Sequence, residues 1–122
     1  MRILKYYSFH EWAKSEKISD DVLRRAVNEL SNGLFEASLG GGLYKKRVAR
    51  LGQGKRSGYR TIIALRNHER AIFMYGFAKN ERENMTHQEE VVYKKLAKFY
   101  LELSDHQINM LIQQGEFTEV QQ

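Results

Sequence analysis

Arg60 is the side chain in this sequence best suited to binding an anion. It is the third residue of Gly58–Arg66, a mostly apolar stretch whose composition predicts a β-strand. A cation in such a strand loses hydration, and this is unfavourable unless the cation meets an anion or a water-filled cleft. Two interpretations are open: a bound anion such as a phosphate, or a structural ion pair with a carboxylate from a neighbouring helix.

Further cations are predicted to lie on the same face of the sheet as Arg60. In the expected strand Leu43–Leu51, side chains alternate between the two faces. If the apolar residues of this strand face the helices, Lys45 and Arg47 point to the open face. Lys46 then lies on the core side, where its long side chain can reach an edge.

Two more cations follow the expected strand Arg70–Ala78. In an antiparallel meander the end of this strand comes beside the start of Gly58–Arg66, so Lys79 and Arg82 should approach Arg60. Their alternative role is that of solvent-exposed charges before a helix. The cations expected around one open sheet face are Arg47, Arg60, Lys79 and Arg82.

The positive charge is concentrated in the middle of the chain. Residues 43–82 carry eleven basic and two acidic side chains, a net +9, whereas residues 1–42 are balanced and residues 83–122 carry a net −4. Within this block, Lys55 and Arg56 lie in a glycine-rich loop with no acid beside them. Such a surface gains free energy by displacing counterions from phosphates, which favours a nucleic-acid partner over a merely solubilising basic face.

Composition excludes several classes of protein. The 122 residues contain no cysteine, so disulfide and thiolate chemistry is excluded. There is no apolar run long enough to cross a membrane and no signal-peptide pattern, so we expect a cytoplasmic protein without a membrane partner. The four histidines are scattered without ligand spacing, and we expect no metal and no cofactor.

Capping patterns predict four helices. The first backbone amides of a helix have no partner within the helix, and the hydroxyl of a preceding serine or threonine can accept a hydrogen bond from one of them. A Glu or Gln three residues after that serine or threonine completes a capping box. Gly33 is placed to end the second helix. The predicted starts are Ser8, Ser19, Thr86 and Ser104, the last two giving C-terminal helices over about residues 86–115.

Apolar and alternating segments predict four strands, Ile3–Tyr7, Leu43–Leu51, Gly58–Arg66 and Arg70–Ala78. The order β-α-α-β-β-β-α-α predicts an α+β fold: a small antiparallel sheet with helices packed on one face. Residues 71–77 are apolar on both faces, which indicates a central strand. The length predicts a single domain over residues 1–122.

The sequence resembles the RelE/ParE superfamily of type II toxins, most closely its RelE-like subgroup. Two ordered blocks within residues 39–85 carry the resemblance, LGGGLYKKRVARLGQGKRSGYRTIIALR and ERAIFMYGFAKNERENM. The resemblance implies a RelE-like microbial-ribonuclease fold, a cognate antitoxin as partner, and cleavage of mRNA in the ribosomal A site. The antitoxin is expected to cover the cationic face with an acidic or helical segment, or to displace the helix at residues 83–103.

The resemblance also implies roles for individual residues. Arg60, in Gly58-Tyr59-Arg60, matches an arginine that stabilises the scissile phosphate. Many relatives carry a tyrosine or histidine acid or base after the last basic segment, where this chain has Asn84-Met85-Thr86 followed by His87. A desolvated Lys79 amine can serve instead. The implied catalytic set is Arg47, Arg60, Lys79 and Arg82, and the implied RNA-binding set is Lys45, Lys46, Arg50, Lys55, Arg56 and Asn84.

Three other functions are compatible with the sequence. A non-enzymatic ParE-like toxin would act on gyrase, but such toxins generally lack this basic set. An RNA- or DNA-binding module would lose affinity gradually as single cations are removed, whereas an enzyme would fail abruptly at Arg60. A degenerate, inactive toxin retained with its antitoxin is the third. The basic set favours a ribosome-dependent endoribonuclease.

Overall fold

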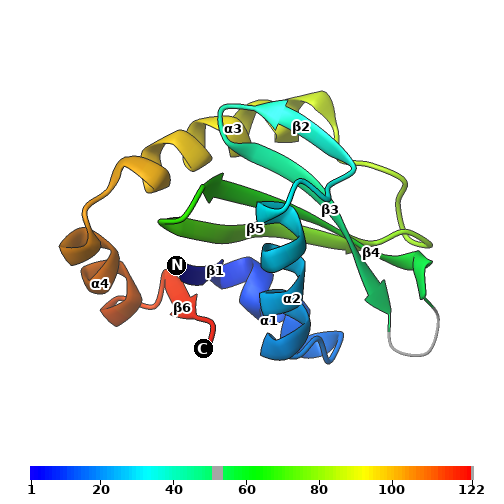
Figure 1. The fold of residues 1–122 in the computed structure, drawn as a ribbon, viewed down its shortest axis with the longest axis horizontal. Helices are drawn as coiled ribbons and strands as arrows, with labels where there is room; N and C mark the ends of the chain where they lie inside the picture. Colours follow the sequence, from blue (N-terminus) through cyan, green and yellow to red (C-terminus); the bar gives the residue numbers. More distant parts are fainter. Residues whose placement is uncertain (51–53, 122) are drawn as a thin grey trace.

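In the computed structural model, which describes residues 1–50 and 54–121, six strands form one sheet and four helices pack against it (Figure 1). For Arg50 and residues 54–57 only the backbone is described. In chain order the elements are β1 (Arg2–Tyr6), α1 (Tyr7–Ser15), α2 (Asp20–Ser31), β2 (Ala37–Gly40), β3 (Leu43–Arg50), β4 (Gly54–Arg66), β5 (Arg70–Ala78), α3 (His87–Glu102), α4 (Asp105–Gln113) and β6 (Phe117–Glu119).

The sheet is mostly antiparallel. Its strand order is β2-β3-β4-β5-β1-β6, with β1 parallel to β5 and the other neighbours antiparallel. This confirms the predicted α+β class. It also confirms a central position for β5, which lies between β4 and β1 and is buried at all but one residue.

Sequence reasoning missed β2 and β6. β2 is a four-residue strand that returns into β3 through Gly41 and Gly42, both at positive φ. β6 is three residues long and pairs with β1, where Arg2 binds Glu119 with 2.9 Å between Nε and Oε2. Strands this short are too brief to establish an alternating pattern, so tertiary pairing defines them.

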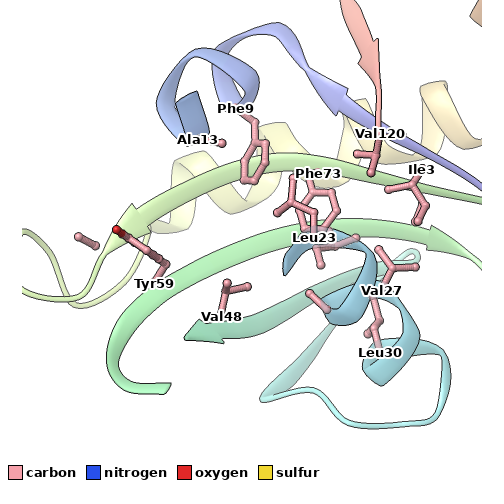
Figure 2. Close-up of a cluster of buried hydrophobic side chains, with 14 residues drawn as sticks. Ile3, Phe9, Ala13, Leu23, Val27, Leu30, Val48, Tyr59, Phe73 and Val120 are labelled. Atoms are coloured by element: carbon pink, nitrogen blue, oxygen red, sulfur yellow. The ribbon is translucent and has the colours of Figure 1, made fainter. Parts of the chain in front are cut away.

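The expectation that all helices pack on one face of the sheet is wrong. One cluster of buried side chains lies between the sheet and helices α1 and α2, and Figure 2 shows Phe9, Leu23 and Phe73 within it. A second cluster, with Ile62 and Tyr100, lies between the sheet and helices α3 and α4. The central strands are apolar on both faces and therefore need a covering layer on each side.

Three of the four predicted caps are confirmed. Ser19, Thr86 and Ser104 each accept a hydrogen bond from the third following amide, and the latter two form complete capping boxes. The prediction at Ser8 is wrong, because α1 begins one residue before it. β1 runs directly into α1, and the Tyr7 amide donates to the Glu116 carbonyl at 2.8 Å, so a tertiary contact replaces the side-chain cap.

Candidate active site

Arg47 and Arg60 lie directly opposite each other on strands β3 and β4. Two residues away in the same register, Lys45 is opposite Ile62, which belongs to the buried cluster under α3 and α4. Alternation therefore places all three cations on the α3 side of the sheet. Like charges directly opposite in an antiparallel pair are destabilising, so the fold keeps Arg47 and Arg60 together against a local penalty.

Each guanidinium of this pair contains one donor that the described residues leave unsatisfied. Arg60 is only 6% exposed, and its Nη1 is buried without a hydrogen-bond partner among the described residues, as is Nε of Arg47. Burial lowers the pKa of Arg60, the charge of Arg47 lowers it further, and the Glu36 carboxylate opposes these effects. Buried donors are rarely left unpaired in native structures, so the pair is the candidate site for an anion.

The alternative interpretation, that Arg60 forms a structural ion pair with a carboxylate from a helix, is wrong for the described residues. Among the described residues no carboxylate lies in salt-bridge contact with its guanidinium, and the acidic group that acts on it, Glu36, precedes β2 rather than lying on a helix.

Replacing Arg47 by methionine should stabilise the protein. The change removes a like-charge contact and a buried unpaired donor while keeping an apolar stem, so we expect the free energy of unfolding to rise by about 0.5 to 1 kcal/mol. Urea denaturation at pH 7 measures this. Arg25→Met, on the exposed part of α2, is the control and should change stability little. A loss of stability in Arg47→Met would mean that the guanidinium is satisfied within the folded chain.

Lys79 lies at the end of the sheet that also carries Arg60. Its backbone amide donates to the carbonyl of Gly58 at 3.3 Å, two residues before Arg60 along β4, and its side chain is exposed. The predicted proximity of the end of β5 to Gly58 is therefore confirmed, although β4 itself begins earlier, at Gly54. Lys79 and the half-buried Lys45 lie at the margins of the central arginine pair.

Arg82 is held by its neighbours in a way that Arg60 is not. Its guanidinium forms a two-pronged pair with Glu89 at 2.6 and 3.2 Å, donates to the Tyr75 hydroxyl at 2.6 Å, and donates from Nε to the Asn84 carbonyl at 3.0 Å. The same group lies 5.5 Å from the centre of the Phe77 ring. Its charge is therefore compensated, and its plane is fixed over an aromatic surface.

A β-bulge at Met74 places the aromatic residues of this site. Phe73 points towards α1 and α2, and the pairing between β4 and β5 then skips Met74. After this extra residue, each side chain of β5 points to the opposite face from the one that simple alternation would give it. Tyr75 therefore joins the α3-side cluster, and Phe77 becomes the direct cross-strand neighbour of Arg60. Bulges are common beside active sites because they redirect side chains. Sequence reasoning missed both aromatic residues, since simple alternation assigns them to the other face.

The ion pair between Arg82 and Glu89 should make stability depend on pH. Hydrogen bonds from Arg82 are the largest cause that holds the pKa of Glu89 at about 2, below its usual 4.5. The ion pair stabilises the fold fully at any pH above the pKa that Glu89 has in the unfolded chain. Wild-type stability should therefore fall as the pH drops from about 4.5 towards 2. We expect Glu89→Gln, which retains the capping box, to lower the free energy of unfolding by about 0.5 kcal/mol at pH 7.

Chemical denaturation of both proteins between pH 3 and pH 7 measures this difference. The two stability curves should converge as the pH falls. If the difference in stability between the two proteins stays constant with pH, the ionised Glu89 carboxylate is not its cause.

Lys46 does not lie with the other cations, which corrects its assignment as an RNA-binding residue. It is 2% exposed and its Nζ lies 2.8 Å from Oε1 of Glu29 on α2, on the opposite face of the sheet from Arg47. A buried and paired ammonium cannot reach an RNA on the α3 side. The alternation had placed this side chain on the core side, and its partner Glu29 explains how the charge is tolerated there.

The remaining predicted RNA-binding residues are only partly described. The side chains of Arg50, Lys55 and Arg56 lie outside the described residues. Asn84 is exposed, and its Oδ1 accepts from the Met85 amide at 3.0 Å, so it shapes the turn that also holds Arg82.

No metal site is found in the described ranges. They contain no group of three or more His, Asp or Glu side chains that could hold a metal ion. In the same ranges, none of the helices is both long enough and apolar enough to traverse a bilayer. Tyr75 on β5 and the exposed Lys79 just after it carry groups that can transfer a proton, and β5 is the strand that pairs with β4 beside Arg60.

These features define a small α+β protein whose sheet sets two arginines opposite each other, each with a buried nitrogen that lacks a partner among the described residues. The chain belongs to the RelE family: residues 1–120 match the family described as RelE toxin of the RelE / RelB toxin-antitoxin system. The match confirms the resemblance seen in residues 39–85 and identifies the protein as a toxin, for which the family implies a cognate antitoxin. A search of curated proteins finds no match.

Proposed function

We propose that this toxin is a ribosome-dependent endoribonuclease that cuts mRNA and so inhibits translation. The observation that carries the proposal is the pairing of Arg47 with Arg60, two opposed cations with buried nitrogens that lack partners among the described residues. A phosphate of RNA suits this arrangement, because an unsatisfied buried cation destabilises the fold until an anion meets it.

The chemistry that suits this pair is transfer at an RNA phosphate. The 2′-oxygen attacks the adjacent phosphorus and the bond to the 5′-oxygen breaks, which leaves a 2′,3′-cyclic phosphate and a 5′-hydroxyl. Negative charge accumulates on the phosphate oxygens in the transition state, and fixed arginines stabilise it without reorganising. In this proposal Arg47 and Arg60 hold those oxygens.

Two protons must move in this reaction. The proton of the 2′-hydroxyl passes to water, and the 5′-oxygen receives a proton from the Lys79 ammonium group, which lies at the same end of the sheet as Arg60. Arg82 stays in the proposed active site, but its charge is shared with Glu89, so its role is to orient its neighbours. Lys45, and the cations whose side chains are not described, hold the RNA backbone.

Primer extension on purified translating ribosomes tests the proposal. The purified toxin should produce cuts in the A-site codon, and the same mRNA without ribosomes should stay intact. If cells stop growing but no cut appears on ribosomes, the endoribonuclease proposal is wrong, and a gyrase supercoiling assay then tests the non-enzymatic alternative.

A further inference from the structure

A cavity of about 400 Å³ opens beside Phe77 and Arg82, and no step of the reaction described above uses the space inside it. It lies at the edge of β5 where β1 has already ended, since the last paired residues of these strands are Lys5 and Phe73. Helix α1 borders it on one side, and α3 and the turn after β5 border it on the other. Its volume falls within the range of small-molecule sites.

The walls of this cavity are mainly aromatic. They include Trp12 from α1, Tyr75 and Phe77 from β5, and Tyr93 from α3. The Tyr75 and Tyr93 rings are stacked with centroids 5.3 Å apart and planes at 24°. The Tyr93 side chain is partly buried against the α3-side cluster, and this desolvation raises the pKa of its hydroxyl to about 12. The rings are thus held by packing before any ligand arrives.

Polar groups lie at the rim of the same cavity. The Arg82 guanidinium lines it and is fixed by Glu89, which removes the conformational freedom that a surface arginine normally has. The Ser8 hydroxyl and the Glu81 carboxylate also line it, and both residues are exposed. A ligand with a flat apolar face and a polar edge therefore matches the cavity better than an aliphatic one does.

The cavity and Arg60 are linked through Phe77. Phe77 contributes to the cavity wall and is the direct cross-strand neighbour of Arg60, whose side chain lies on the same face. Cross-strand neighbours have Cβ atoms about 5 Å apart, so a single nucleotide and its phosphate can span the two sites.

We propose that this cavity is a nucleobase subsite that takes the base of a nucleotide next to the phosphate held by Arg47 and Arg60. The inference rests on the proposed function, because the RNA phosphate defines which nucleotide reaches the cavity. Stacking on aromatic side chains and arginine planes is how proteins bind unpaired RNA bases. The subsite selects a nucleotide that is splayed out of its strand.

The single tryptophan of the chain makes the test direct. Trp12 lines the cavity, so its fluorescence reports a bound base without any need for catalysis. We expect 3′-mononucleotides to quench it saturably, and ribose 5-phosphate and inorganic phosphate to leave it unchanged. Quenching by inorganic phosphate equal to that by nucleotides, or no quenching by any nucleotide, would overturn the subsite.

Variants at two walls locate the binding. Tyr93→Leu removes a stacking ring, and Ser8→Phe fills the cavity from the exposed start of α1; each should weaken the quenching constant by about tenfold or more. Tyr44→Leu, whose ring packs on Phe35 elsewhere, is the matched control and should bind like the wild type. Circular dichroism confirms folding. Unchanged nucleotide binding in folded Ser8→Phe would overturn the location.

The ribosome assay separates this inference from the proposed function. Cuts on ribosomes by a protein that binds no nucleotide would overturn the subsite and leave the endoribonuclease intact. Saturable quenching by nucleotides with no ribosomal cut would support the base subsite and overturn the proposed function.

Discussion

Arg60→Ala should lower the rate of A-site cleavage at least about a hundredfold, the usual effect of removing a preorganised oxyanion contact. Arg60 is the most buried member of the arginine pair, and its Nη1 has no partner in the described part of the chain. This donor therefore lacks an acceptor within the described part of the fold, and a phosphate oxygen would supply one. We expect the rate to fall mainly through kcat, since charge builds up in the transition state.

The same substitution should leave the fold intact. Removing an unsatisfied buried cation offsets the loss of its packing, so the free energy of unfolding should stay within about 1 kcal/mol of wild type. Arg60→Lys keeps the charge but not the two-pronged geometry and should retain only part of the rate. Arg25→Ala, on exposed α2, is the control and should cut normally. Wild-type cleavage by Arg60→Ala would remove Arg60 from the active site.

Gly76→Ala should be the most destabilising single-methyl change in this part of the sheet, by about 2 to 3 kcal/mol. A Cβ at Gly76 would lie 2.2 Å from Cζ3 and 2.6 Å from Cε3 of the Trp12 ring. The Trp12 ring is itself held by edge contact with Tyr59, with centroids 5.3 Å apart, so it cannot move aside easily. Overpacking rather than backbone strain is the cause, because the φ of Gly76 is not in the left-handed region.

A double-mutant cycle checks this cause. In a Trp12→Leu background the Gly76→Ala change should be nearly neutral, because the opposing ring is gone. Thermal or urea unfolding of the four proteins measures the coupling. If Gly76→Ala destabilises equally in both backgrounds, the contact with Trp12 is not the reason. Any loss of cleavage by Gly76→Ala would also show how far α1 positions Tyr75 and Phe77 on either side of it.

Sequence reasoning located the cations but not all of their partners. Arg60 was identifiable because a charge in an apolar strand is conspicuous, and antiparallel order was enough to place Lys79 beside Gly58. The pairing of Arg82 with Glu89 was not identifiable: Glu89 has a complete explanation as part of a capping box, and only the folded turn shows that it also binds a cation.

The aromatic part of the site depended on a single irregularity. Without the bulge at Met74, Tyr75 and Phe77 would face α1 and α2, and Arg60 would have no aromatic neighbour on its own strand pair. Nothing in the local sequence marks the bulge, because every residue from Ala71 to Ala78 is apolar, aromatic or small and fits either face.

The features that could be predicted from neighbouring residues are the helix caps and the strand alternation. Hydroxyl caps at Ser19, Thr86 and Ser104 act within one helical turn, and strand alternation acts within one segment, so both could be predicted from neighbouring residues. The tertiary structure alone decided the second helical layer and the short strands β2 and β6. It also decided the separation of Lys46 from Arg47, because burial and pairing depend on elements distant in sequence.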